Sequence, residues 1–295
     1  MLQRLVEEAD LGGRRPGGLA AKLIFAVAVS WSLFQLWFAS PLPFAFNTGI
    51  FNDTQARAIH LAFAFFLVFL CYPAFKRSSR TRIPAADWAL ALIAAFVAAY
   101  LIIFYRELAA RPGQPTTADL VTAAIGMLVL LEATRRTQGM GMVWIAGFFI
   151  FYSFGGRYMP DVIQHGGVSA SKFLQHMWLT TEGVFGVALG VSTNFVFLFV
   201  LFGALLDKAG GNNWMMQISV ALLGHLRGGP AKVAVVSSAA NGIVSGSSVS
   251  NVVSGGIFTI PLMKRSGLSG VKAAAIETAS SANGQIMPPV MGAAS

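Results

Sequence analysis

A polar stretch that contains glycine interrupts an apolar part of the chain between Asn241 and Asn251. It reads Asn-Gly-Ile-Val-Ser-Gly-Ser-Ser-Val-Ser-Asn, so hydroxyl and amide oxygens follow one another closely. Neutral oxygens of this kind suit hard monovalent cations such as Na⁺, and the carbonyl groups at helix ends add to them. A helix that starts after the turn directs its N–H groups and partial positive charge towards an anion. The candidate binding residues here are Ser245, Gly246, Ser247, Ser248 and Asn251.

A second break follows in the last apolar run, which ends in Asn-Gly-Gln-Ile-Met-Pro-Pro. The two prolines lack N–H groups, so carbonyl groups one turn earlier lose their helical partners. In a membrane, such backbone is tolerated only where it is buried in protein or lines a water-filled cavity. Transporter sites near the middle of the bilayer are built from such broken helices. The candidate residues of this break are Gly284, Gln285, Pro288 and Pro289.

We therefore expect the two breaks to meet at one depth and to form half of a transport site. The competing interpretation is that the small residues Ser245, Gly246 and Ser247 only let two helices pack closely. An isolated Ser/Gly cluster would favour close packing. Two clusters on either side of one basic loop favour the transport interpretation.

The composition predicts that the lipid bilayer is the solvent of this protein. Of its 295 residues, 55% are hydrophobic and only 11% are charged, whereas ordinary globular domains carry about 25% charged residues. The net charge of +9 would suggest nucleic acid as a partner of a soluble protein. Here the basic residues lie between apolar runs, so membrane topology explains them and we predict no nucleic-acid partner. The single cysteine, Cys71, excludes an intrachain disulfide.

The apolar runs predict an all-α integral membrane protein, a bundle of several spanning helices. The predicted spans are 20–40, 57–75, 87–105, 118–136, 140–158 and 183–206. The fourth run is long enough only if the helix continues from Leu131 to Arg135 and Arg136. Residues 159–182 predict a linker with a surface helix, and residues 214–226 an amphipathic helix. Gln35 and Asn194, polar residues within the spans, are expected to hydrogen bond between helices.

The basic residues predict the orientation of the chain. With the N-terminus in the cytoplasm, 16 Lys and Arg residues fall on the cytoplasmic side and five on the other side, as the positive-inside rule requires. Lys232 and Lys264 then both lie in the cytoplasm. The 31 residues between them are too few for two crossings of about 20 residues each. The chain is therefore expected to enter and leave on one side, as a re-entrant helical hairpin with its tip at Ser245–Ser248.

Glu277 lies in the last apolar run, and an acid in such a position is a functional candidate by default. The alternative is an ionised residue near the interface, or one paired with a lysine of the preceding loop. The sequence has no Walker-A pattern, no His/Cys/Asp set with metal-ligand spacing and no base placed beside a serine. We predict neither an enzyme nor a transition-metal or cofactor site.

Five motifs together resemble the permease of a tripartite ATP-independent periplasmic (TRAP) transporter, in the fused 4TM/12TM type of the TAXI group. They are Thr-Thr-Glu-Gly-Val-Phe-Gly-Val-Ala-Leu-Gly-Val from Thr180, Arg-Gly-Gly-Pro-Ala-Lys from Arg227, Ser-Gly-Ser-Ser-Val-Ser-Asn from Ser245, Phe-Thr-Ile-Pro-Leu-Met-Lys-Arg from Phe258 and Gly-Gln-Ile-Met-Pro-Pro-Val-Met-Gly from Gly284. The resemblance is strong over 178–295. It is looser over 20–158, where Leu131-Glu-Ala-Thr-Arg-Arg contributes.

The resemblance implies a secondary transporter in the bacterial inner membrane. It implies Na⁺-driven uptake of an organic anion, a carboxylate, which a periplasmic substrate-binding protein delivers to a permease with an elevator-type motion. Residues 1–158 would be the region like the small subunit, with about four spans and a connecting helix. Residues 159–182 would be the linker and interfacial helix, and residues 183–295 the first part of the large transport domain.

The resemblance also assigns residues within the site. Ser245, Ser247, Ser248 and Asn251 match the tip of the first hairpin of the family, and 284–289 match the unwound segment that follows it. Asn283 departs from the pattern, which has a small residue there. The family's transport region continues through a second, inverted half, so this chain is expected to be truncated. The alternative function is a non-transporting membrane scaffold or assembly fragment, which binds a partner and moves nothing.

Overall fold

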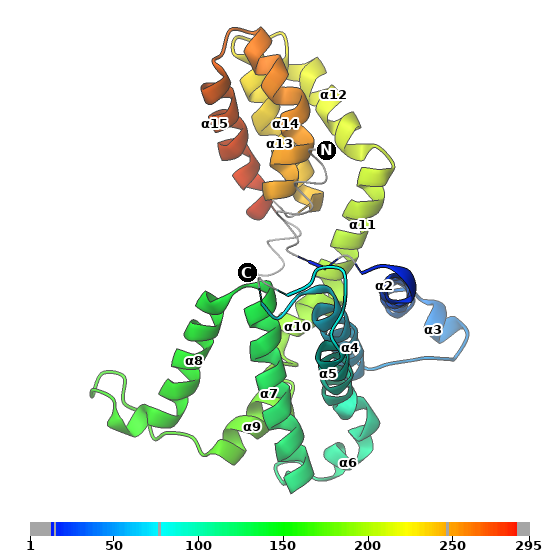
Figure 1. The fold of residues 1–295 in the computed structure, drawn as a ribbon, viewed down its shortest axis with the longest axis vertical. Helices are drawn as coiled ribbons and strands as arrows, with labels where there is room; N and C mark the ends of the chain where they lie inside the picture. Colours follow the sequence, from blue (N-terminus) through cyan, green and yellow to red (C-terminus); the bar gives the residue numbers. More distant parts are fainter. Residues whose placement is uncertain (1–12, 15, 76–77, 246–247, 288–295) are drawn as a thin grey trace. The chain divides into compact units, whose positions relative to one another are not determined.

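The computed structural model describes residues 13–287 except Arg15, Lys76, Arg77, Gly246 and Ser247. The side chains of Val244, Ser245, Val249 and Ser250 also lie outside the description. The described chain forms helices and no strand, so the predicted all-α membrane fold is confirmed. It divides into two compact units, formed by residues 13–193 and 194–287, and each is described by itself (Figure 1).

Within the described part of the chain, five helical segments are long and apolar enough to cross a membrane. They are Gly18–Ala39, Asp53–Cys71, Ala85–Ile103, Thr117–Thr137 and Val187–Lys208. The fourth helix continues past Arg136, which a span of sufficient length in this part of the sequence requires. The expected span 140–158 is helical, but its α-helix, Met140–Gly155, has only 16 residues and is shorter than a crossing of about 20 residues.

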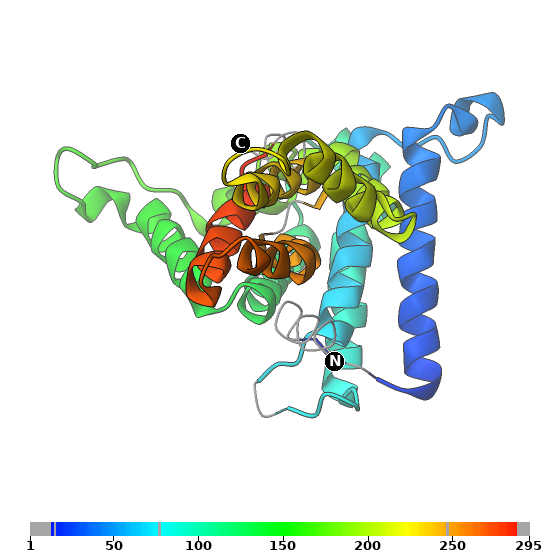
Figure 2. The ribbon, with the colours of Figure 1, turned by 90° about the horizontal axis from the view of Figure 1, so that it is seen from above.

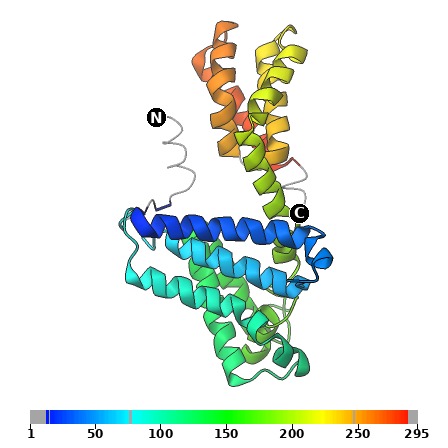
Figure 3. The ribbon, with the colours of Figure 1, turned by 90° about the vertical axis from the view of Figure 1, so that its right-hand side faces the viewer.

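The unit of residues 13–193 consists of helices joined by turns and loops. They are α2 (Gly18–Ala39), α3 (Leu42–Ala45), α4 (Asp53–Cys71), α5 (Ala85–Ile103), α6 (Tyr105–Ala110), α7 (Thr117–Thr137), α8 (Met140–Gly155), the 3₁₀ turn η1 (Gly156–Tyr158), α9 (Ala170–Trp178) and α10 (Val187–Val191). α2 lies along α4, and α4 along α5 (Figures 2 and 3). The π-helical segment η2 (Ser192–Val196) follows α10.

Local sequence sets where two of the long helices begin. Asn52 and Gln55 form a capping box at the start of α4, in which each side chain accepts a hydrogen bond from the other residue's backbone N–H. Thr116 and Asp119 do the same at the start of α7. Such caps satisfy N–H groups that the first helical turn leaves without partners.

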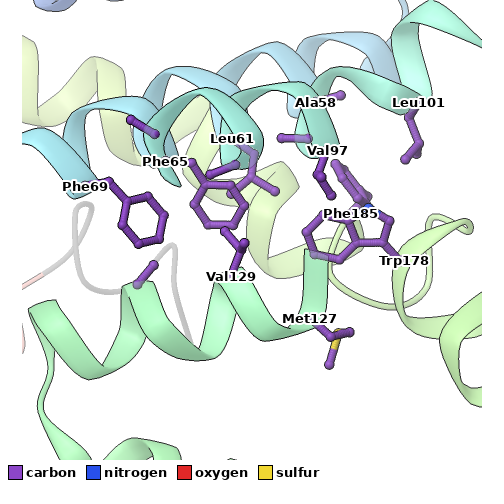
Figure 4. Close-up of a cluster of buried hydrophobic side chains, with 14 of the residues drawn as sticks. Ala58, Leu61, Phe65, Phe69, Val97, Leu101, Met127, Val129, Trp178 and Phe185 are labelled. Atoms are coloured by element: carbon purple, nitrogen blue, oxygen red, sulfur yellow. The ribbon is translucent and has the colours of Figure 1, made fainter. Parts of the chain in front are cut away.

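The core of the first unit lies between α4, α5, α7 and the segment around Trp178 (Figure 4). The indole of Trp178 is fully buried. It stacks on Phe65 at a centroid distance of 6.5 Å and meets the edge of Phe185 at 5.3 Å. The two rings therefore hold the indole in one position. Gly126 on α7 provides the space for it, because a Cβ atom at Gly126 would lie 2.3 Å from the indole ring.

Gly126→Ala should therefore destabilise this unit. Alanine favours the helix over glycine by up to about 1 kcal/mol, but overpacking a filled core costs about 1–3 kcal/mol, and the flanking rings hinder the indole from moving away. We expect a lower midpoint in thermal unfolding followed by tryptophan fluorescence. Gly147→Ala on α8 is the control, because a Cβ atom there meets nothing within 4 Å. Equal midpoints for the two variants would contradict this account of the core.

A buried ion-pair network ties the N-terminal segment to α5 and α7. Oδ2 of Asp87 lies 2.5 Å from a guanidinium nitrogen of Arg14, and Oδ1 lies 2.9 Å from a guanidinium nitrogen of Arg136. The three side chains are at most 5% exposed. Arg136 also pairs with Glu132 at 2.7 Å. Arg14 Nε donates to the carbonyl of Ser79, so the network also holds the loop between α4 and α5.

A second polar cluster joins α2, α4 and the start of the π-helical segment. Gln35 is fully buried, and its Nε2 hydrogen bonds with Nδ1 of His60. Trp31 Nε1 donates to the same ring nitrogen at 3.2 Å, and His60 Nε2 lies 3.2 Å from the Ser192 hydroxyl. The predicted interhelical role of Gln35 is confirmed, and His60 is the residue on which the cluster converges.

Candidate functional site

The candidate site lies in the unit of residues 194–287. Its helices are α11 (Phe197–Lys208), α12 (Gly211–Leu223), α13 (Gly229–Ser245), α14 (Ser248–Arg265) and α15 (Gly270–Ser281), followed by the 3₁₀ turn η3 (Ala282–Gln285). α13 and α14 pack against each other, and α15 and η3 pack against both (Figure 1). Fully buried Ala234, Met263 and Ala273 form the apolar contact among the three helices. This arrangement is a helical hairpin with a third helix in its groove.

The third helix breaks close to the predicted position. α15 ends at Ser281, and the chain continues as a 3₁₀ turn to Gln285. The backbone N–H groups of Ile286 and Met287 both donate to the carbonyl of Asn283, at 3.2 and 3.1 Å. The regular α-helix thus ends at Ser281, before the two prolines, because residues 282–285 form a 3₁₀ turn.

The break lies directly against the end of α13. A Cβ atom at Gly242 would be 2.8 Å from Cα of Gly284 and 3.3 Å from the carbonyl oxygen of Asn283. Both glycines are buried. Only a residue without a side chain at position 242 lets the two backbones approach this closely. The second break therefore lies against α13 close to its end, while Gly246 and Ser247 of the first break lie outside the described residues.

Hydrogen bonds between buried polar groups fix the three helices around this crossing. Asn251 is 2% exposed, and its Nδ2 donates to the carbonyl of Ser238 at 3.1 Å. The Ser238 hydroxyl donates to the carbonyl of Ser280 at 3.1 Å. α14 is thereby linked to α13, and α13 to the end of α15. A buried polar chain of this kind specifies one helix arrangement, because every alternative leaves buried groups unpaired.

Asn241 is a buried polar residue with an unused acceptor. It is 3% exposed, and its Oδ1 has no hydrogen-bond partner among the described residues. It lines a pocket of about 250 Å³ together with Asp207, Asn212, Asn213 and Ser254. A buried acceptor without a partner costs about 1–3 kcal/mol, so a water molecule, an ion or a ligand group in this pocket would be stabilised.

The comparisons with known proteins place the chain in a family. Residues 125–295, more than half of the chain, match the family described as "Tripartite ATP-independent periplasmic transporter, DctM component". The chain belongs to this family. No curated protein and no solved structure matched in the other two comparisons.

This TRAP permease component is thus an integral membrane transport protein and not an enzyme. Permeases of the family take up substrate together with a periplasmic substrate-binding protein. The match includes the hairpin, α15 and both breaks. Among the described residues, no group of three or more His, Cys, Asp or Glu side chains is placed to hold a metal ion.

The predicted site residues of this TRAP permease fall into three groups. Asn251 and Gly284 are buried and take part in the contacts described above. Ser248 is half-buried at the first turn of α14, and Gln285 is exposed at the end of η3. Gly246, Ser247, Pro288 and Pro289 lie outside the described residues, as does the side chain of Ser245, whose backbone ends α13.

Sequence reasoning missed several residues that hold the TRAP permease hairpin together. They are Ser238, Gly242, Thr259 and Ser280. Each is a small or polar residue in the middle of an apolar run. The pairs Ser237-Ser238 and Ser280-Ser281 were the available signal, since doublets of serine inside a membrane helix need partners. Their spacing does not say which partner each one finds.

Proposed function

We propose that this TRAP permease couples the uptake of an organic anion, a carboxylate, to Na⁺. The hairpin tip at Ser245–Ser248 and the break at 284–289 would supply half of the shared site. The observation that carries the proposal is the close approach of Gly242 and Gly284. It brings the end of α13 and the broken end of α15 to one point, where Gly242 and Gly284 are both buried.

The helix ends explain which ligand each segment suits. The last carbonyl groups of α13, which have no intrahelical partner, are oxygen ligands of the kind that Na⁺ binds. The first N–H groups of α14, near Ser248, favour an anionic group. Asn251 stands one turn into α14 and is held by Ser238, so its position is fixed before a ligand arrives. The unpaired Asn241 Oδ1 adds an acceptor close to the same place.

The family and the charge distribution support a proposal for the cellular setting. We infer the bacterial inner membrane, the N-terminus in the cytoplasm, and the fused 4TM/12TM type of the TAXI group. The excess of Lys and Arg on the segments assigned to the cytoplasm supports the orientation. The motifs around Ser245 and Gly284 support the type.

The decisive test is transport in liposomes that contain the complete transporter of which this chain is part. Uptake of labelled organic acids would be followed with and without the periplasmic binding protein and with and without a Na⁺ gradient. We expect uptake only when both are present. Uptake that needs neither would contradict the proposed mechanism, and binding of the partner without any uptake would favour the scaffold function.

Ser247→Ala combined with Ser248→Ala should weaken Na⁺ binding, so that uptake falls and needs more sodium. Each hydroxyl removed from a small cation site is one oxygen ligand lost, and a net hydrogen bond to a charged group is worth about 1.5–3 kcal/mol. The control is Ser153→Ala on α8, whose hydroxyl donates to Phe149 of its own helix. Uptake of the double variant with an unchanged sodium requirement would place the ion elsewhere.

A further inference from the structure

Glu277 is a buried carboxyl group that the proposed sodium site does not use. It is 1% exposed on α15 and faces α14. The elements that pack against α15 are α13, α14 and η3. Their charged residues within the described part of the chain are Lys232, Lys264 and Arg265, and α15 itself adds Lys272; all four are exposed. None of the ion pairs among the described residues includes Glu277.

The other buried acids of the described chain differ from Glu277 in this respect. Asp87 lies between two arginines, and Asp119 pairs with Arg111 at 3.2 Å. An ionised carboxylate in an apolar interior is expensive unless a positive charge compensates it. The expected pairing of Glu277 with a lysine of the preceding loop is not among these ion pairs. The group must therefore be kept neutral or be compensated by a bound cation.

The hydrogen bonds of Thr259 are compatible with a neutral carboxyl group at Glu277. The Thr259 hydroxyl has one hydrogen, which it can donate to the carbonyl of Gly255 at 3.1 Å. The same oxygen lies 2.5 Å from Oε2 of Glu277. When the single hydrogen points to the carbonyl, the hydroxyl oxygen is an acceptor, and only a protonated carboxyl group can donate to it. The Gly255 carbonyl, the Thr259 hydroxyl and Oε2 of the protonated carboxyl group then each have a partner without any ion.

The backbone of α14 is shaped around this carboxyl group. A Cβ atom at Gly255 would lie 2.8 Å from Oε1 of Glu277, and one at Gly256 would lie 3.4 Å from its Cγ. Two consecutive buried glycines thus leave a space that the side chain of Glu277 fills. A space filled by the side chain itself leaves little volume for a cation with several ligands.

We propose that Glu277 carries a proton at neutral pH and donates it to Thr259 Oγ1, which makes the contact of α14 with α15 a proton-binding site separate from the hairpin tip. When the two helices separate, water enters, and the proton passes from Glu277 to solvent. An exposed glutamate has a pKa of about 4.3, so the separated form is ionised. Alkaline pH therefore favours separation of the helices. The inference requires only that this unit opens during transport, and it does not depend on sodium as the coupling ion.

Infrared spectroscopy of the chain in lipid tests the protonation directly. With ¹³C-labelled glutamate, the carbonyl stretch of a protonated glutamic acid at pH 7 is separated from all aspartate signals. We expect this band in the wild type, its loss in Glu277→Gln, and its retention in Glu182→Gln, which changes a side chain that is 74% exposed. Thr259→Val removes the proposed acceptor and keeps Glu277, so it should shift the band without removing it. The shift would assign the band to the carboxyl group that contacts Thr259.

Hydrogen exchange of the α14 and α15 amides tests the link to opening. The measured exchange rate divided by the intrinsic exchange rate gives the equilibrium constant for opening. In the wild type this constant should increase about tenfold per pH unit between pH 6 and 8, because opening releases one proton. In Glu277→Gln it should be independent of pH. A wild type without the infrared band, or with opening as independent of pH as the variant, would overturn the proposal. Either result leaves the sodium requirement of uptake, measured separately, unaffected.

Discussion

Asp87→Asn should lower the free energy of unfolding of the unit formed by residues 13–193 by about 3–5 kcal/mol, the usual cost of removing one partner from a buried ion pair. The two arginines that meet at Asp87 are at most 3% exposed. Without the carboxylate, both guanidinium groups stay buried, and Arg14 keeps no acidic partner among the described residues. The loop that carries Ser79, which Arg14 also binds, should loosen with it.

The measurement is thermal or chemical unfolding of the purified chain in lipid or detergent, and the control is Asp53→Asn. Both aspartates lie in the first turn of a helix, so the loss of helix-dipole stabilisation is matched. Asp53 is 66% exposed and lies 3.5 Å from Arg57, and an exposed pair contributes at most about 1 kcal/mol. Adding Arg14→Gln to Asp87→Asn should restore part of the stability. Equal destabilisation by the two aspartate variants would show that the network contributes nothing specific.

The long helices of this protein could be predicted from sequence because a membrane imposes simple requirements on composition. Apolar runs near 20 residues, flanked by Pro41, Asp87 or Arg135, give the spans within a few residues. The partners of Asp87 could not be predicted. Arg14 and Arg136 are far from it along the chain, and a residue at the end of an apolar run is expected at the interface. The π-helical segment Ser192–Val196 also has no sequence signature.

In the candidate site, too, the positions of the helices could be predicted from the sequence and the partners of the side chains could not. Interrupted hydrophobicity was enough to locate the hairpin and the end of α15, because glycine, serine and proline interrupt a membrane helix for few reasons. The contacts within the site depend on helix rotation, which these short runs do not define. Asn251 was expected at the tip as a ligand, and the structure shows its amide donating to Ser238. Glu277 was ambiguous between a surface pair and a functional acid until Thr259 and Gly255 were seen beside it.

Gly242 on α13 and Gly255 on α14 both allow a close contact, but Gly242 contacts backbone and Gly255 contacts a side chain. The space at Gly255 is limited by the far end of the flexible side chain of Glu277, which can rotate. The space at Gly242 is limited by the backbone of Asn283 and Gly284, which cannot move without moving the break itself. The same substitution should therefore have unequal effects on transport at the two positions.

Gly242→Ala should reduce uptake by the complete transporter by about five- to a hundredfold, as overpacking by about 1–3 kcal/mol predicts. The added methyl group would be 2.8 Å from Cα of Gly284, so η3 must move away from α13, and the segments of the proposed sodium site separate. Gly255→Ala is the matched change on α14, and it should affect uptake less while altering the infrared band of Glu277. Uptake would be measured in liposomes at several Na⁺ concentrations, with Gly242→Ala needing more sodium. If Gly242→Ala transports as the wild type does, the approach of α13 to the break is a packing contact, and the site must be sought elsewhere in the permease.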